Sequence, residues 1–109
     1  MSDIQVMSPL KVEGYIAKYV LPIRKSVLTL SGEKIGEMEG RLRELIFRED
    51  DDKNREDIER ILVLLWYAGK CGGQLKESRW SNNEIRISIW FLSIKDIEAL
   101  EELLNLHYK

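Results

Sequence analysis

The hydrophobic positions after residue 31 recur with the period of an α-helix. Apolar residues fall on one face of this segment, at Ile35, Met38, Leu42, Leu45 and Ile46. Their i, i+3, i+4, i+7 spacing predicts an amphipathic helix. We expect Ser31 to cap this helix and Glu33 to lie in its first turn, where the helix dipole favours an anion.

A second helical pattern begins near Arg55. Its apolar positions on one face are Ile58, Ile61, Leu62 and Leu65, and residues 61–68 are apolar on all sides. This continuous apolar run predicts burial on several sides. We expect the glycines at 69, 72 and 73 to end the helix. Residues 49–57 are acidic and lack apolar side chains, which indicates a solvated connection between the two helices.

The segment before residue 31 is more ambiguous. Its apolar residues at Tyr15, Ile16, Tyr19, Val20 and Ile23 have helical spacing. Because proline disrupts a helix interior, we expect a helix that ends near Leu21, just before Pro22. Residues 27–30 have the composition of a short strand.

Residues 74–91 have the pattern of a β-hairpin. Apolar Ile85, Ile87, Ile89 and Phe91 alternate with Arg86, Ser88 and Trp90. Strict alternation predicts a half-buried strand, and residues 74–80 can pair with it. With Asn82-Asn83 as the turn, Trp80 would face Ile85 and Arg79 would face Arg86.

The last helical pattern runs from residue 94 to residue 108. We expect Ser93 to cap this helix, with Asp96 three residues further on. Its apolar residues cover well over half of the circumference: Ile94, Ile97, Ala99, Leu100, Leu103, Leu104, Leu106 and Tyr108. A helix on one side of a small domain needs only a ~100° stripe, which favours a two-fold partner helix over a groove of the same domain.

These elements predict one small, mainly helical α+β domain over residues 1–109, with the order helix, helix, helix, hairpin, helix. The chain has 109 residues, of which 44% are hydrophobic and 33% charged. No apolar run approaches the ~20 residues of a membrane span, and no secretory signal opens the chain. We therefore expect a soluble, cytoplasmic protein. Abundant charged residues suggest a heat-adapted source.

The charge is unevenly distributed. The net charge is −2, but cations exceed anions in residues 11–30 and 61–92, whereas residues 31–60 are acidic. Facing arginines at 79 and 86 would repel each other across the hairpin, which a bound anion such as a phosphate would relieve. Two alternatives remain: Glu77 and Glu84 neutralise the arginines, or the register slips by one residue.

The element order resembles the winged-helix family of DNA-binding domains over residues 32–104. The part similar to the third helix of that family is Ile58-Glu-Arg-Ile-Leu-Val-Leu-Leu-Trp-Tyr-Ala-Gly69. Residues 75–90 would be the wing, and residues 94–106 the appended helix with which many such regulators dimerise. The resemblance implies a third helix in the major groove and a wing on the backbone. This chain departs from that pattern because Glu56 and Glu59 lie on the outward face of the third helix.

Three other patterns could carry chemistry or a contact. Glycines at 32, 36 and 40 form a stripe that permits close packing, either by the first helix of this chain or by another subunit. The residues Asp50, Asp52 and Asn54 match the start of an EF-hand loop, but Arg55 and Ile61 replace its glycine and final glutamate. Cys71 and His107, the only cysteine and the only histidine, have no evident third partner for catalysis. We therefore expect no enzyme activity, no cofactor and no metal site.

Two functional hypotheses follow. The first is a dimeric regulator that binds double-stranded DNA through phosphate contacts. Its candidate cations are Lys76, Arg79 and Arg86 of the hairpin, with Lys11, Lys18, Arg24 and Lys25. The second is a non-catalytic oligomerisation or adaptor subunit with a protein partner. The candidate interface in a homodimer is Ile94, Ile97, Leu100, Leu103, Leu104 and Tyr108. The acidic third helix favours the second hypothesis, whereas the element order favours the first, which we adopt.

Overall fold

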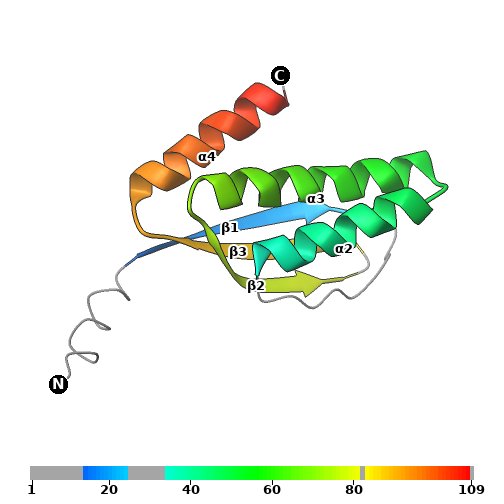
Figure 1. Cartoon of the computed structure of the whole chain (residues 1–109), viewed down its shortest axis with the longest axis horizontal. Coiled ribbons are helices and arrows are strands. Elements are labelled where there is room, and N and C mark those ends of the chain that lie inside the picture. The colour runs from blue at the N-terminus through cyan, green and yellow to red at the C-terminus, as the bar shows by residue number, and fades with distance from the viewer. Residues whose placement is uncertain (1–13, 25–33, 82, 109) are drawn as a thin grey trace.

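In the part of the chain that the structure describes, three antiparallel strands form one sheet, and three helices lie on one side of it (Figure 1). The computed structural model describes residues 14–24, 34–81 and 83–108. The elements are β1 (Tyr15–Pro22), α2 (Ile35–Arg48), α3 (Asp52–Lys70), β2 (Gln74–Trp80), β3 (Glu84–Phe91) and α4 (Ile94–His107). The strand order is β1-β3-β2, so the strand with the clearest alternating pattern is the central one.

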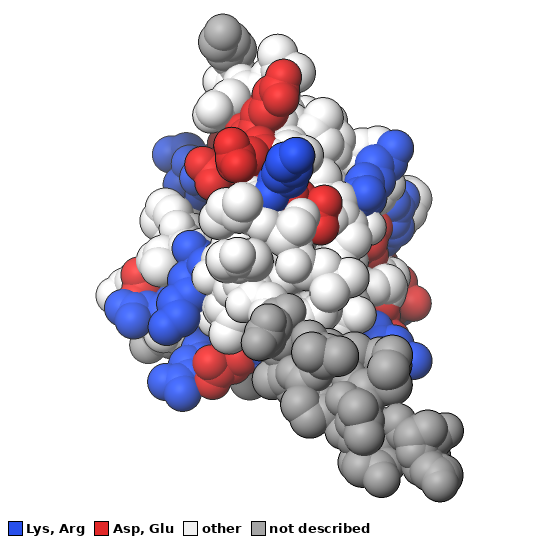
Figure 2. Space-filling model, turned by 90° about the vertical axis from the view of Figure 1, so that its left-hand side faces the viewer, with Lys and Arg blue, Asp and Glu red and all other residues white. Residues whose placement is uncertain are grey.

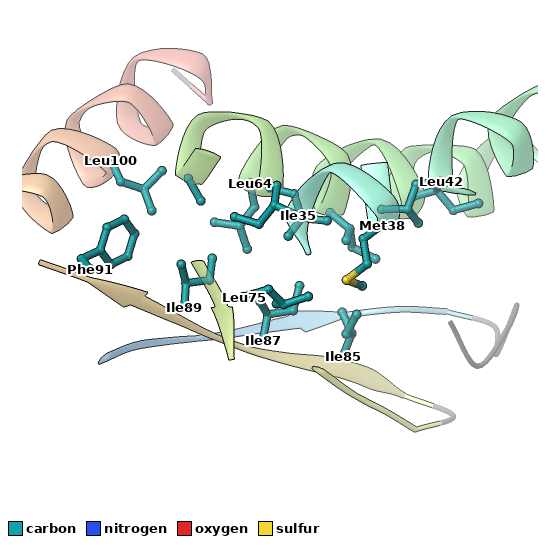
Figure 3. Close-up of a cluster of buried hydrophobic side chains, with 14 of the residues drawn as sticks. Ile35, Met38, Leu42, Leu64, Leu75, Ile85, Ile87, Ile89, Phe91 and Leu100 are labelled. Atoms are coloured by element: carbon teal, nitrogen blue, oxygen red, sulfur yellow. The ribbon is translucent and has the colours of Figure 1, made fainter. Parts of the chain in front are cut away.

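The core lies between the sheet and the helices. The alternating apolar residues of β3 are fully buried and point toward the helices, as Figure 3 shows for Ile85, Ile87, Ile89 and Phe91. From the helices, Met38 and Leu42 of α2 and Leu100 of α4 meet them. The predicted apolar face of α2 is thereby confirmed. The predicted apolar face of α3 is confirmed at Ile58, Ile61 and Leu65, which are buried, whereas Leu62 is half-buried.

The first element is a strand and not the predicted helix. Each residue of β1 pairs with a residue of β3, from Tyr15 opposite Phe91 to Pro22 opposite Glu84. An edge strand carries apolar side chains on both faces here, which produced the misleading helical spacing. Pro22 ends the strand at the sheet edge, where proline is tolerated. The element order is therefore strand, helix, helix, hairpin, helix, and the predicted order is wrong at its start. Residues 27–30 lie outside the described residues.

The helix boundaries also differ from the predictions. The N-cap of α2 is Lys34, which makes no side-chain capping hydrogen bond; Ser31 and Glu33 lie outside the described residues. Helix α3 begins at Asp52, earlier than expected, because the Asp51 side chain caps it by accepting hydrogen bonds from the Lys53 and Asn54 amides. The connection is thus only residues 49–51. The predicted cap of α4 is confirmed, since Ser93 Oγ accepts from the Asp96 amide.

The glycines behave differently from one another. Gly69 lies within α3, and Gly72, just after the helix, has a φ of +79°, the left-handed conformation that favours glycine. Gly73 follows where β2 approaches the core. Gly36 and Gly40 face open space on α2, so none of the described helices packs against them; Gly32 lies outside the described residues. Among the described helices, none is both long and apolar enough to cross a bilayer.

Candidate nucleic-acid interface

The side of the sheet turned away from the helices carries the candidate site. We call it the open sheet face. Its side chains are Ile16, Lys18, Val20 and Pro22 of β1, Gln74, Glu77 and Arg79 of β2, and Glu84, Arg86, Ser88 and Trp90 of β3. They alternate with the residues that point into the core, because successive side chains of a strand lie on opposite faces. The described helices lie on the other side (Figure 1).

The strand register brings Arg79 and Arg86 together. Arg79 lies opposite Arg86, and Trp80 lies opposite Ile85, as the hairpin prediction required. Asn82 lies outside the described residues, and Ser81 and Glu84 are joined by a backbone hydrogen bond across the turn. The one-residue slip that the sequence left open is therefore excluded. The register also places Val20 opposite Arg86, which the sequence did not predict.

Each of these arginines has a carboxylate on its own strand. Arg79 Nε donates to Glu77 Oε1 over 2.7 Å, and Arg86 Nε donates to Glu84 Oε1 over 2.9 Å. These pairs reduce the repulsion between the two guanidinium groups without any bound anion. The side chains of Arg79 and Arg86 remain 75% and 66% exposed. A guanidinium has five N–H donors, so each arginine keeps donors that face solvent.

A third cation completes the basic part of the face. Lys18 lies opposite Ser88 on the central strand and forms no ion pair with any residue that the structure describes. Lys18, Arg79 and Arg86 line one shallow depression of about 230 Å³, together with Val20, Glu77 and Ser88. The depression therefore has cations on both sides of β3. An anionic group placed there would meet donors from all three strands.

The other predicted cations are placed differently. Lys76 is exposed where the register of β2 shifts between Leu75 and Glu77, so it lies beside the face at the sheet edge. Arg24 does not belong to the face. Its amide donates to Asp57 of α3, and its guanidinium pairs with Glu56 over 3.6 Å. It is thereby held on the helical side. Lys11 and Lys25 lie outside the described residues.

The buried carboxylate of Asp57 was missed by the sequence reading. The residue is 2% exposed although it lies in the segment that was expected to be solvated. Asp57 Oδ2 accepts from the Arg24 amide over 2.9 Å, and Oδ1 accepts from Arg60 Nη2 over 2.9 Å. Arg60 Nη2 also donates to the carbonyl of Pro22 over 2.7 Å. These contacts fasten the end of β1 to α3 and so hold one strand of the open sheet face.

The predicted interface residues of α4 fall into three groups. Ile97 and Leu100 are buried in the core of the same chain, which removes them from any interface with a partner. Leu103 and Leu104 are half-buried. Ile94 and Tyr108 are 50% and 53% exposed, respectively. Helix α4 thus buries Ile97 and Leu100 on its own domain and keeps exposed apolar side chains at its two ends, and whether it also meets a partner helix stays a prediction.

The two candidate residues for catalysis, Cys71 and His107, lie at the ends of different helices. Cys71 is the half-buried C-cap of α3, and its thiol pKa is raised by burial and by the nearby Asp96 carboxylate. His107 lies in the last turn of α4, in edge contact with the rings of Tyr67 and Tyr108. Among the residues that the structure describes, no three His, Cys, Asp or Glu side chains are grouped as metal ligands would be.

No family model, no curated protein and no solved structure matches this chain. The resemblance to winged-helix domains therefore stays a prediction.

Proposed function

We propose that this chain binds nucleic acid, with phosphate groups contacted by the basic side chains of the open sheet face. The proposal keeps the central part of the sequence hypothesis, in which Arg79 and Arg86 of the hairpin hold phosphates. A regulator that acts on double-stranded DNA as a homodimer is its most specific form.

One observation supports the proposal above the others. Lys18, Arg79 and Arg86 come from three different strands and line one depression on a face that no described helix covers. Arginine and lysine account for most protein contacts to phosphate, and such contacts supply the sequence-independent part of the affinity. Glu77 and Glu84 each pair with one of the two guanidinium groups. The proposal therefore depends on the remaining N–H donors of Arg79 and Arg86 and not on the net charge of the face.

The proposal is tested by fluorescence anisotropy of a labelled random duplex at several salt concentrations. We expect log affinity to fall linearly with log salt concentration. The double variant Arg79→Ala/Arg86→Ala should weaken binding for all sequences and reduce the salt slope by about 2, roughly one for each lost phosphate contact. Arg41→Ala, an exposed cation on α2, is the matched control and should leave both unchanged.

Two results would contradict the proposal. Absence of duplex binding at ~50 mM salt and tens of micromolar protein would exclude double-stranded DNA, and with it the regulator form of the proposal, because non-specific affinities for duplexes reach the micromolar range even at physiological salt. Equal affinities for the wild type and the double variant would exclude the open sheet face as the site.

A second candidate function, a non-catalytic adaptor or oligomerisation subunit, is favoured by a different surface. Tyr15, Leu92 and Ile94 are 49%, 65% and 50% exposed, where β1 begins and where β3 leads into α4. Figure 2 faces this end and shows uncharged surface in its middle, with acidic side chains gathered above it. Exposed apolar patches commonly mark protein interfaces. Sedimentation equilibrium tests this candidate: Leu92→Lys/Ile94→Lys should dissociate a dimer, and a monomeric wild type would contradict self-association.

A further inference from the structure

We infer that the open sheet face binds single-stranded nucleic acid in preference to a duplex. The inference rests on the proposed function and specifies the form of its ligand. Helix α3 and the hairpin are poorly suited to the grooves of a duplex, whereas the open sheet face combines cations with an aromatic side chain.

Helix α3 is poorly suited to enter a groove. Helix α3, the counterpart of a recognition helix, uses Ile58, Ile61 and Leu65 to build the core. Its exposed positions near the N-terminal half include Glu56 and Glu59, whose carboxylates would face the phosphates of a duplex. Such a charge arrangement opposes the ~1.7 Å charge spacing of double-stranded DNA. Groove reading by α3 is therefore disfavoured by both burial and charge.

The hairpin cannot enter a groove either. The major groove is ~12 Å wide and admits an α-helix or a two-stranded ribbon. Here β3 is paired along its whole length with β1 as well as with β2, so the hairpin is part of a three-stranded sheet. Neighbouring strands lie ~4.8 Å apart, which puts the axes of the outer strands ~10 Å apart before side chains are added. This broad surface fits a splayed strand better than a groove.

The face combines cations with an aromatic side chain. The half-buried side chain of Trp90 lies on the same side of β3 as Arg86, four residues further along, which corresponds to ~13 Å along the strand. Ile16 flanks Trp90 on β1 and is 55% exposed. The Trp90 indole packs against Gly14, where a side-chain Cβ would clash with the ring, so the backbone of Gly14 holds the indole in place.

This combination is what a flexible single strand requires. Single strands are held by cations that follow the backbone and by aromatic rings on which unpaired bases stack. A duplex keeps its bases stacked internally, so Trp90, Ile16 and Val20 would gain little from it. On the open sheet face, Lys18, Arg79 and Arg86 would contact phosphates while Trp90 and its apolar neighbours contact bases.

The test compares three labelled probes by anisotropy at ~50 mM salt: a 20-residue oligothymidylate, a 20-residue oligouridylate and a 20-base-pair random duplex. At least one single strand should bind roughly tenfold or more tightly than the duplex. Val20→Glu, at a position 54% exposed between Lys18 and Arg86, should weaken single-strand binding about tenfold or more. Trp90→Leu should do the same and leave duplex binding nearly unchanged. Arg41→Ala is again the control, and thermal melting confirms that each variant is folded.

The outcomes separate this inference from the proposed function. A preference for either single strand that Val20→Glu removes supports both, and the tighter of the two strands identifies DNA or RNA as the ligand. Equal or tighter duplex binding that is lost in Arg79→Ala/Arg86→Ala overturns the single-strand inference and keeps the proposed function. Absence of binding to all three probes, or binding that no change on the open sheet face affects, overturns both.

Discussion

Removal of the Asp57 carboxylate should destabilise the protein more than any other single change to a charged residue described above. The carboxylate is 2% exposed and accepts two hydrogen bonds, from the Arg24 amide and from Arg60 Nη2, both over 2.9 Å. Asp57→Ala deletes both and leaves the Arg24 amide without its acceptor. The end of β1 then loses its tie to α3.

The expected loss follows from these contacts. A hydrogen bond to a charged group contributes ~1.5–3 kcal/mol, and breaking a fully buried ion pair costs ~3–5 kcal/mol. The side chains of Arg24 and Arg60 are 53% and 36% exposed, so water can solvate the freed guanidinium groups and the cost is reduced. We therefore expect a loss of about 2–3 kcal/mol in the free energy of unfolding, or roughly 10–20 °C in Tm for a domain of this size.

Urea denaturation followed by circular dichroism measures this loss. Glu56→Ala is the matched control, because Glu56 is the preceding residue, also pairs with Arg24 and is 66% exposed. Its removal should cost ~0–1 kcal/mol, as for other surface ion pairs. If Asp57→Ala costs no more than Glu56→Ala, the account of Asp57 as the tie between β1 and α3 is refuted.

Three further predictions concern the interior. The Tyr19 hydroxyl is buried and has no hydrogen-bond partner among the residues that the structure describes, so Tyr19→Phe should stabilise the protein by about 1 kcal/mol in the same urea assay. Burial, with smaller effects of Glu101 and Cys71, raises the pKa of Tyr19 above its ordinary value of 10.0. The corresponding contribution to the free energy of unfolding is complete below pH 10 and is lost as the pH rises through the pKa of Tyr19 in the folded protein. Tyr19→Phe should therefore reduce the loss of stability at alkaline pH. The raised pKa of Cys71 predicts that iodoacetamide modifies it more slowly at pH 8 than it modifies free cysteine, and an equal rate would contradict its burial. Gly73→Ala should destabilise the protein by ~1–3 kcal/mol, because its Cβ would lie 2.7 Å from Ile89 Cγ2 and 2.9 Å from the Ala68 carbonyl oxygen. Gly36→Ala, in open space on α2, should instead stabilise the protein by up to ~1 kcal/mol. Equal effects of the two changes would refute the close packing around Gly73.

The sequence predicted correctly the hairpin, the apolar face of α2 and the cap of α4. The alternation in β3 and the short turn fixed which residues face each other, including Arg79 and Arg86. The amphipathic stripe of α2 and the Ser93 cap of α4 also matched the structure. Each of these features depends on residues close together in the chain.

The parts that were missed depend on distant residues. β1 is a strand because it pairs with β3, and the partner of Tyr15 is Phe91, which is far from it in the sequence. The same pairing turned a predicted free hairpin into a sheet and created the open sheet face. Asp57 lies in an acidic stretch that looked solvated, and only the return of β1 beside α3 explains its burial. The hydrophobic period within one segment predicts neither the pairing of β1 with β3 nor the contact between Asp57 and the end of β1.

The central claim is that the open sheet face is the site where nucleic acid binds. Amide chemical-shift mapping of the ¹⁵N-labelled protein, titrated with an oligothymidylate and with a duplex, tests it most directly. The account predicts that the shifted amides gather on the three strands, around Lys18, Arg79 and Ser88, and that the helices change little. Shifts confined to α3 and α4, or none with either probe at tens of micromolar protein, would contradict it.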